Sequence, residues 1–410
     1  MSLDTSSKRA TGGNISASAR TDRASALEEV RRLLPNIRAR AAQTEANRRI
    51  PAETISELKA AGLFGLMTPK MFGGTELGFG ALVDIAAAIA SACGSTGWVY
   101  SVLAGHNWMV ALYPELAQSE VFGKKDSLTA SVFRFSAKVV QVPGGYEMTG
   151  GEGRFCSGID FADWAILGSA VQRENAPAEP MYFLVPKSAI EVVDDWFTMG
   201  MRGTGSRTIR VAKAFIPQHR AVLGSEIMQG TTSGAAFHRS AAYSLPFPVA
   251  LPISLVGPLL GMAQGALEDV VASNAKKLGA MSEEQVGEKG TFFERLARAA
   301  ADIDAARALV DADCQRLDHL TDASGLSRLD RFRAQRNFAY AVQQCRYAVT
   351  RLFEASGGSG IYDGGALQRF FRDINSAAGH TAFAWDDAAP GFSRALLGLP
   401  QSRFAGPRRS

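Results

Sequence analysis

A chain of 410 residues, 46% hydrophobic and 20% charged, is long enough for two or three domains around a large buried core. Its 44 basic and 40 acidic residues are spread along the chain, which argues against nucleic acid as the main partner. The four cysteines stand far apart without a CxxC pair, so the sequence indicates neither a metal site nor a disulfide framework, and it fits a reducing compartment.

Helical periodicity follows a polar leader. Residues 1–22 are rich in Ser, Thr, Gly and basic side chains and are predicted to be disordered. Apolar residues then recur at helical spacing, with Pro51 as a start and Gly62 as a stop. A loop at 69–80 precedes a helix at 81–93 whose small residues suit close packing. No apolar run reaches membrane-spanning length and no signal core is visible, so we expect a cytoplasmic protein without a membrane segment.

The next predicted helix, 97–112, carries the first chemical candidate. His106 lies in the middle of an apolar stripe on this helix. It can be a core histidine that is satisfied by a backbone carbonyl, or a histidine that faces a cofactor pocket. In the second interpretation Trp98 and Trp108 line that pocket.

From about residue 125 the hydrophobic period becomes alternating. Short runs of β-branched and aromatic residues with short connections predict a small domain of antiparallel hairpins, with strands at 131–142, 146–149, 164–171, 181–185 and 208–216. The segment 200–206, GMRGTGS, looks like a phosphate loop, but it lacks the lysine and the following helix. We interpret it as a structural turn.

Within this domain, the stretch 148–164, MTGGEGRFCSGIDFADW, combines two glycine pairs with an aromatic ring, a thiol, a hydroxyl and carboxylates. Glycines permit close approach of a ligand to the backbone, and hydroxyls can bond its heteroatoms. A surface turn between two strands is the alternative.

The rest of the chain is predicted to be helical from about residue 248. Apolar stripes at 292–310 and 338–352, with helices at 255–271 and from 367, indicate an up-down four-helix bundle.

This order of elements resembles the acyl-CoA dehydrogenase superfamily across nearly the whole chain. The matching segments are LFGLMTPKMFGG (63–74), 150–168, GMRGTGSRTIRVAKAFIPQHR (200–220) and LQRFFRD (367–373). The resemblance implies a mainly α fold with a β-domain: a leader at 1–22, an N-terminal helical domain at 23–124, a central β-barrel or sandwich domain at 125–240, a C-terminal four-helix bundle at 241–398 and a tail at 399–410.

Two branches of the superfamily can be compared with the sequence. The dehydrogenases carry a catalytic glutamate in a YEGT-like motif after the last long helix, but the chain after Asp373 reads INSAAGHTAFAWDDAAP. Removal of an α-proton from a thioester needs a carboxylate, so its loss weakens that branch. The segments CGSTGWVYSVLAGHNW (93–108) and FCSG (155–158) instead resemble oxygenase subunits of two-component flavin-dependent monooxygenases.

This resemblance implies roles for individual residues. Ser157 would lie beside flavin N5 and O4 and donate a hydrogen bond that holds the C4a-hydroperoxide and slows the loss of peroxide. Further flavin contacts would come from Ser131, Phe155, Cys156 and Arg369. His106, with Trp98 and Trp108, would lie on the substrate side, and His380 would be the base that takes a phenol or ring N–H proton. Phe383 stands where some relatives carry Asp or Asn.

The implied cofactor is FMNH2, with FADH2 as the alternative, and O2 is the co-substrate. The implied partners are a separate NAD(P)H:flavin reductase, a small phenol- or indole-type substrate, and copies of the chain in a homotetramer. Two rivals remain. One is an acyl-CoA dehydrogenase or oxidase with a relocated base. The other is a bundle protein without catalysis or with hydrolytic activity, although no GxSxG occurs.

Overall fold

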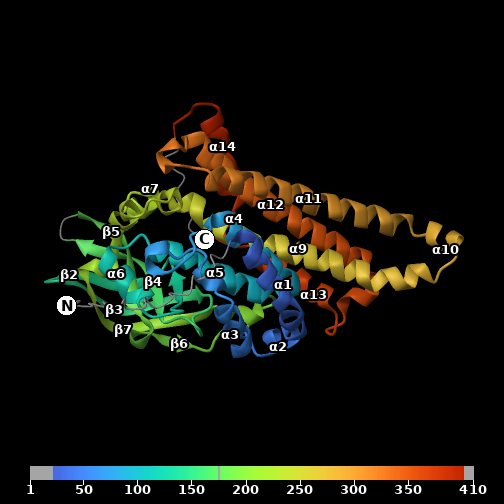
Figure 1. Ribbon diagram of the computed structural model, residues 1–410, viewed down its shortest axis with the longest axis horizontal. Helices are drawn as coiled ribbons and strands as arrows, with labels where there is room; N and C mark the ends of the chain where they lie inside the picture. Colours follow the sequence, from blue (N-terminus) through green and yellow to red (C-terminus); the bar gives the residue numbers. More distant parts are fainter. Residues whose placement is uncertain (1–21, 174–175, 401–410) are drawn as a thin grey trace, which may run out of the picture.

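A computed structural model describes residues 22–173 and 176–400 (Figure 1). The sheet lies at one end of the molecule and long helices extend to the other end, with the N-terminal helices between them. Most of the predicted leader and tail, residues 1–21 and 401–410, lies outside the described residues.

The N-terminal layer is helical, as predicted. Asp22 caps its first helix by accepting a hydrogen bond from the backbone N–H of Ser25 (2.8 Å). Gly62 stops the third helix in the left-handed conformation (φ 69°), which glycine adopts without strain. The helices are α1 (Arg23–Ala39), α2 (Ala41–Ala46), α3 (Ala52–Ala60), α4 (Gly78–Ala92), α5 (Gly94–Val110) and α6 (Glu115–Phe122).

The sheet has eight strands within the described residues. The hydrogen-bonded order is β6-β7-β3-β2-β4-β5-β8, and β1 pairs with β4. Their bounds are β1 (Thr129–Val132), β2 (Ser136–Val142), β3 (Gly145–Cys156), β4 (Trp164–Arg173), β5 (Ala176–Pro186), β6 (Glu191–Val193), β7 (Arg207–Pro217) and β8 (Ala221–Leu223).

Two predictions for the sheet need correction. The single strand predicted at 131–142 is two strands, because the chain bends at 133–135 and the Phe135 N–H donates to the Gly168 carbonyl (2.7 Å). The sheet is also not wholly antiparallel, since β1 and β2 each pair with β4 in parallel. The stretch 148–164 is the end of a strand followed by a turn.

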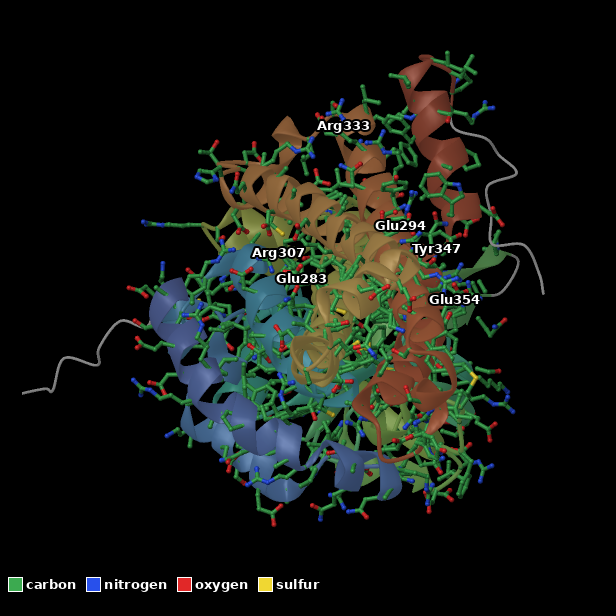
Figure 2. All side chains as sticks on the ribbon, turned by 90° about the vertical axis from the view of Figure 1, so that its right-hand side faces the viewer. Glu283, Glu294, Arg307, Arg333, Tyr347 and Glu354 are labelled. Atoms are coloured by element: carbon green, nitrogen blue, oxygen red, sulfur yellow. The ribbon has the colours of Figure 1, made fainter. Side chains whose placement is uncertain are left out.

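The predicted bundle helices are present as α9 (Phe247–Gly279), α11 (Gly290–Asp318), α12 (Arg328–Ala355) and α13 (Ala366–Ala377). Charged side chains lie on the exposed part of the bundle, among them Glu294 on α11 and Glu354 on α12 (Figure 2). The remaining α-helices of the described chain are α7 (Gly224–Gln229), α8 (Ser233–Phe237), α10 (Glu283–Gly287) and α14 (Trp385–Leu396).

Helix α9 contradicts the expectation that no apolar run reaches membrane-spanning length. Its segment Phe247–Ala275 is long and apolar enough to cross a membrane, and it alone passes this test among the described residues. Of the 18-residue apolar window within this segment, however, 83% is buried inside the protein, as in a core helix. Gly257, Gly261 and Gly265 lie against the backbone of α4, where added Cβ atoms would come within 2.6, 2.1 and 2.4 Å of carbonyl oxygens. Small residues thus let the two helices touch, as predicted for α4.

Candidate active site

A cavity of about 940 Å³ lies where the β-domain meets α5, α9 and the segment after α13. Its size is within the usual range for sites that bind small molecules and cofactors. Six side chains that the sequence singled out line it: Trp98, His106, Ser131, Phe155, Ser157 and His380. These come from segments far apart in the chain, and the fold brings them together.

The turn after β3 holds Ser157 in place. Gly158 adopts a left-handed conformation (φ 74°), and its N–H donates to the Thr204 carbonyl (3.3 Å). Lys187 donates to the carbonyls of Ile159 (2.6 Å) and Asp160 (3.0 Å). The carboxylate of Asp160 also pairs with the buried Arg207 of β7 (3.2 Å). The turn is therefore anchored through the three residues that follow Ser157.

Four polar side chains form a hydrogen-bonded row along this wall. The indole Nε1 of Trp98 donates to Ser157 Oγ (3.2 Å), and Ser157 Oγ lies 2.7 Å from Ser206 Oγ. Ser206 Oγ lies 2.7 Å from Thr204 Oγ1, which donates to the Met201 carbonyl (2.8 Å). All three hydroxyl residues are at most 9% exposed. Burial of this kind keeps hydroxyl groups in fixed orientations.

His106 satisfies both interpretations of the sequence. Its Nδ1 lies 2.8 Å from the Thr129 carbonyl, so Nδ1 carries the proton, and Nε2 accepts from the Ser131 hydroxyl (3.1 Å). Burial lowers the pKa of His106 to about 4, although the bond to Thr129 counteracts this. It is a neutral histidine bonded to the backbone, and it also faces the cavity and orients Ser131.

His380 lines the same cavity. Its ring meets Trp98 edge-on, with 5.6 Å between the ring centroids. Its Nδ1 accepts the N–H of Ala382 (3.1 Å), so the neutral ring carries its proton on Nε2. Burial lowers the pKa of His380 to about 4. Both features favour a hydrogen-bond donor and oppose the predicted role as a base.

Aromatic residues form the mouth of the cavity. Phe155 is 69% exposed and meets Trp196 edge-on at 5.9 Å between centroids. The backbone of Phe155 is left-handed (φ 66°), which is strained for a residue with a bulky side chain. Strain of this kind persists where the surrounding structure enforces it, often at a ligand site.

Three predicted contacts lie away from this cavity. Cys156 is fully buried and does not line the cavity, and burial raises the pKa of its thiol. Trp108 is on another face of α5, where its indole donates to the Ala242 carbonyl (2.6 Å). Arg369 is on α13, and its charge acts on the buried Asp373 and on Asp269. Their predicted roles therefore find no support in the lining of this cavity.

The segment 200–206, predicted as a structural turn, also lines the cavity. It contributes Met201, Thr204 and Ser206, which the sequence analysis missed as site residues. Asp373 of α13 fixes the segment by accepting the Met201 N–H (2.5 Å), and burial raises the pKa of Asp373 to about 6. The two hydroxyl residues of GTGS (203–206) could have indicated a site. Their role becomes recognisable, however, only from their contact with Ser157 in FCSG (155–158).

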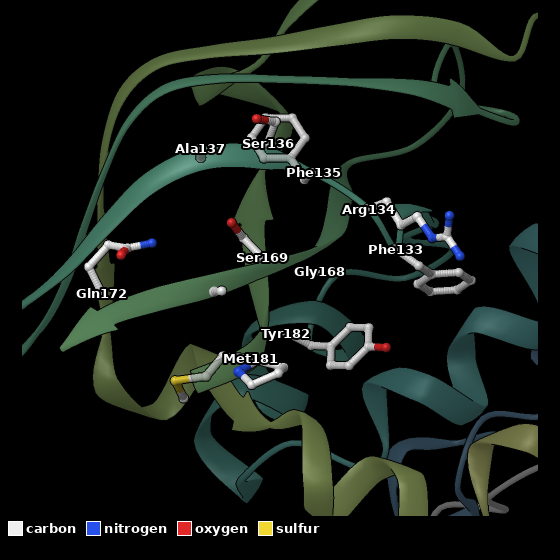
Figure 3. A pocket seen from close by; sticks show the side chains of 12 residues that line it. Phe133, Arg134, Phe135, Ser136, Ala137, Gly168, Ser169, Gln172, Met181 and Tyr182 are labelled. Carbon is white, nitrogen blue, oxygen red and sulfur yellow. The ribbon is translucent and has the colours of Figure 1, made fainter. Parts of the chain in front are cut away.

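A second hollow of about 450 Å³ lies on the β-domain (Figure 3). Phe133, Arg134 and Tyr182 border both this hollow and the larger cavity. In Figure 3 the rings of Phe133 and Tyr182 lie close together beside Arg134. These side chains form the partition between the two spaces.

The three-part fold with a cavity at the junction of its parts defines the class of protein. Family models for acyl-CoA dehydrogenase match the chain twice, the N-terminal domain at residues 21–122 and the C-terminal domain at 253–385. Among solved structures, the 3-HSA hydroxylase from Rhodococcus sp. RHA1 superimposes with a TM-score of 0.88 at 32% identity, covering 93% of this chain and 99% of that one. The predicted fold class is confirmed.

Curated relatives define the family more narrowly. The flavin-dependent monooxygenase oxygenase subunit HsaA of Mycobacterium tuberculosis is 35% identical, over 92% of this chain and 97% of the relative. The oxygenase component of an FADH2-dependent resorcinol hydroxylase from Rhizobium sp. is 31% identical, over 90% and 93%. The chain belongs to the oxygenase components of flavin-dependent monooxygenases, a class of oxidoreductases. This confirms the resemblance found in the sequence.

Proposed function

We propose that this protein uses a reduced flavin and O2 to hydroxylate a small phenol- or indole-type substrate, by way of a flavin C4a-hydroperoxide. The observation that carries the proposal is the cavity itself, in which Ser157, Ser131, His106 and His380 meet among aromatic rings. The named relatives include a resorcinol hydroxylase, which supports a substrate of this kind.

The lining fits a flavin ring, which is flat and has an apolar edge and a polar edge. Aromatic side chains such as Trp98, Phe155 and Trp196 supply apolar surface, while Ser131 and Ser157 supply hydrogen-bonding oxygens. When bound, the reduced flavin supplies the electrons and carries the oxygen that is transferred. FMN is the form expected from the sequence, and the name of one relative specifies FADH2.

His380 would act on the substrate as a donor. A ring with its proton on Nε2 and a pKa lowered to about 4 can hold the oxygen of a phenolate by a hydrogen bond. Removing a proton from a phenol would be unfavourable for such a ring, since an unperturbed phenol has a pKa of about 10. The cavity would thus favour the electron-rich form of the substrate, which reacts more readily with an electrophilic oxygen.

The lining argues against the acyl-CoA dehydrogenase or oxidase alternative. Among the described residues of the cavity wall, Glu152 alone bears a carboxylate, and it is paired with Arg210 (2.7 Å). A carboxylate held in an ion pair at the mouth is poorly placed to remove an α-proton. Purified protein without yellow colour would favour borrowed flavin, whereas tightly held oxidised flavin would favour the alternative.

Two further parts of the proposal concern partners. A separate NAD(P)H:flavin reductase would supply the reduced flavin, because the sequence carries no nicotinamide-binding motif. The homotetramer remains a prediction that light scattering in solution would check.

The experiment that tests the proposal is a single turnover. Protein loaded with FMNH2 is mixed with oxygen in a stopped-flow instrument, and the absorbance of the oxygenated flavin is followed. We expect a transient species and hydroxylated product from a panel of phenols and indoles. Direct reoxidation without such a species, and without product from any of them, would contradict the proposal.

The variant Ser157→Ala should release hydrogen peroxide about tenfold faster, since one hydrogen bond to the oxygenated cofactor is lost. The ratio of peroxide formed to NADH consumed measures this uncoupling. The exposed Ser225→Ala, outside the cavity, is the matched control. Unchanged coupling in Ser157→Ala would remove that role from Ser157.

A further inference from the structure

The row of hydroxyls beside Ser157 has two ends of opposite character. At one end the indole N–H of Trp98 can only donate, and it donates to Ser157 (3.2 Å). At the other end the carbonyl of Met201 can only accept, and it accepts from Thr204 (2.8 Å). Ser206 lies between, 2.7 Å from each of the other two hydroxyl oxygens. These ends decide where the three hydroxyl protons point.

Each hydroxyl has one proton to give. Thr204 gives its proton to the Met201 carbonyl, so Ser206 donates to Thr204 and Ser157 donates to Ser206. In this arrangement every bond of the row is made. The proton of Ser157 therefore points to Ser206, along the cavity wall, so its oxygen can meet a ligand only as an acceptor. This is the reverse of the donor role that the resemblance implied for Ser157.

Ser131 is oriented in the same sense by different neighbours. The Nδ1–H of His106 donates to the Thr129 carbonyl, which leaves Nε2 as an acceptor for the Ser131 hydroxyl. Other hydroxyls of the lining also donate to the backbone: Thr198 to Gly200, Ser254 to Leu251 and Ser376 to Arg372. The cavity thus presents serine oxygens as acceptors.

We propose that Ser206 and Thr204 are positioning residues that hold the Ser157 oxygen as an acceptor, so that the cavity prefers a ligand N–H over a bare ring nitrogen. This inference rests on the proposed function, in which Ser157 lies beside flavin N5. Reduced flavin carries a hydrogen on N5, whereas the N5 of oxidised flavin has only a lone pair. The row would therefore select the reduced cofactor and weaken the hold on the oxidised one.

The size of the preference follows from the hydrogen bonds. To donate into the cavity, Ser157 must receive its bond from Ser206, and Ser206 must receive one from Thr204. Reversal then costs the bond between Thr204 and the Met201 carbonyl. The loss of one neutral hydrogen bond corresponds to about a fivefold change in affinity.

The test compares dissociation constants for oxidised FMN and for FMNH2, measured by anaerobic titration of the whole protein. In Thr204→Val and in Ser206→Ala the Ser157 proton loses its fixed direction. We expect the ratio of the two constants, oxidised over reduced, to fall about fivefold in both. Thr204→Ser keeps the hydroxyl and should keep the ratio of the unchanged protein.

The outcomes separate the two proposals. If the unchanged protein binds flavin in neither state, the proposed function fails. If it binds both and the ratio stays the same in Thr204→Val and Ser206→Ala, the row has no positioning role, even where both affinities fall together. Circular dichroism checks folding, and if one of these variants is misfolded, the ratio in the other decides.

Discussion

Proton positions on the two histidines decide what each can do in the cavity. His106 is committed on both nitrogens, to Thr129 and to Ser131, so it can orient a neighbour but has no proton to give the ligand. His380 uses one nitrogen on the backbone and leaves Nε2–H free. Residue type alone would make either one a candidate base, and the difference between them depends on their hydrogen-bond partners.

His380→Gln should keep activity within about tenfold, because the amide nitrogen of glutamine can still donate. His380→Ala should lose a further factor of about 10 to 100, the range for a hydrogen bond to a charged oxygen. The turnover of both variants with a phenol substrate measures this. An essential base would make glutamine as poor as alanine, and it would add an imidazole titration to the pH profile of the unchanged protein.

Asp373 makes the stability of the protein depend on pH in the direction opposite to that of His106 and His380. Burial raises its pKa from 3.8 to about 6 in the folded protein, so the folded state binds the extra proton. Its contribution to stability is full below pH 3.8 and is lost as the pH rises through 6. His106 and His380 have the opposite effect, because their pKa values are lowered from 6.5 to about 4. Their contribution to stability is lost as the pH falls from 6.5 to about 4.

Asp373→Asn removes the titration while the amide oxygen can still accept the Met201 N–H. Between pH 6 and pH 4, the free energy of unfolding of the unchanged protein, relative to that of the variant, should rise by about 1.4 kcal/mol for each unit by which the pH falls. Urea unfolding across this range measures the difference, and the contributions of the two histidines cancel in it. A pH-independent difference would show that Asp373 does not change its protonation there.

At the scale of elements, the contact between α4 and α9 depends on glycine at repeated positions. Gly261→Ala would place a Cβ 2.1 Å from the Ala87 carbonyl oxygen, so the helices must separate. We expect the free energy of unfolding of Gly261→Ala to fall by about 1–3 kcal/mol. Gly279→Ala, at the end of the same helix with no atom within 4 Å, should be neutral or stabilise by up to about 1 kcal/mol. Equal effects in thermal unfolding would contradict this account of the contact.

The sequence predicted elements better than it predicted contacts between them. Helical periodicity located the bundle, and the small residues of α4 indicated close packing, because both properties are local. The bend that divides β1 from β2 depends on a bond from Phe135 to Gly168, a residue of another strand. Ser206 and Thr204 could not be recognised for a similar reason, since their role appears only when the segment 200–206 meets the turn after β3.

Over the whole molecule, two carboxylates join the N-terminal helices to the bundle. Asp318 of α11 accepts the N–H groups of Phe79 (3.1 Å) and Gly80 (3.0 Å) in the first turn of α4. Asp84 of α4 pairs with Arg23 of α1 (2.5 Å) and with Arg307 of α11, which Figure 2 labels. Helix α4 of the N-terminal layer and helix α9 of the bundle therefore belong to one shared core.

Because this core is shared, the N-terminal helices and the bundle should unfold together, in one calorimetric transition. Asp84→Asn should lower the stability by about 1–2 kcal/mol without splitting that transition; both arginines are partly exposed, which reduces the cost of leaving them unpaired. The exposed Asp386→Asn on α14 is the matched control and should change little. Two resolved transitions, with only one shifted by Asp84→Asn, would show instead that the two helical parts are independent units whose contact contributes little to either.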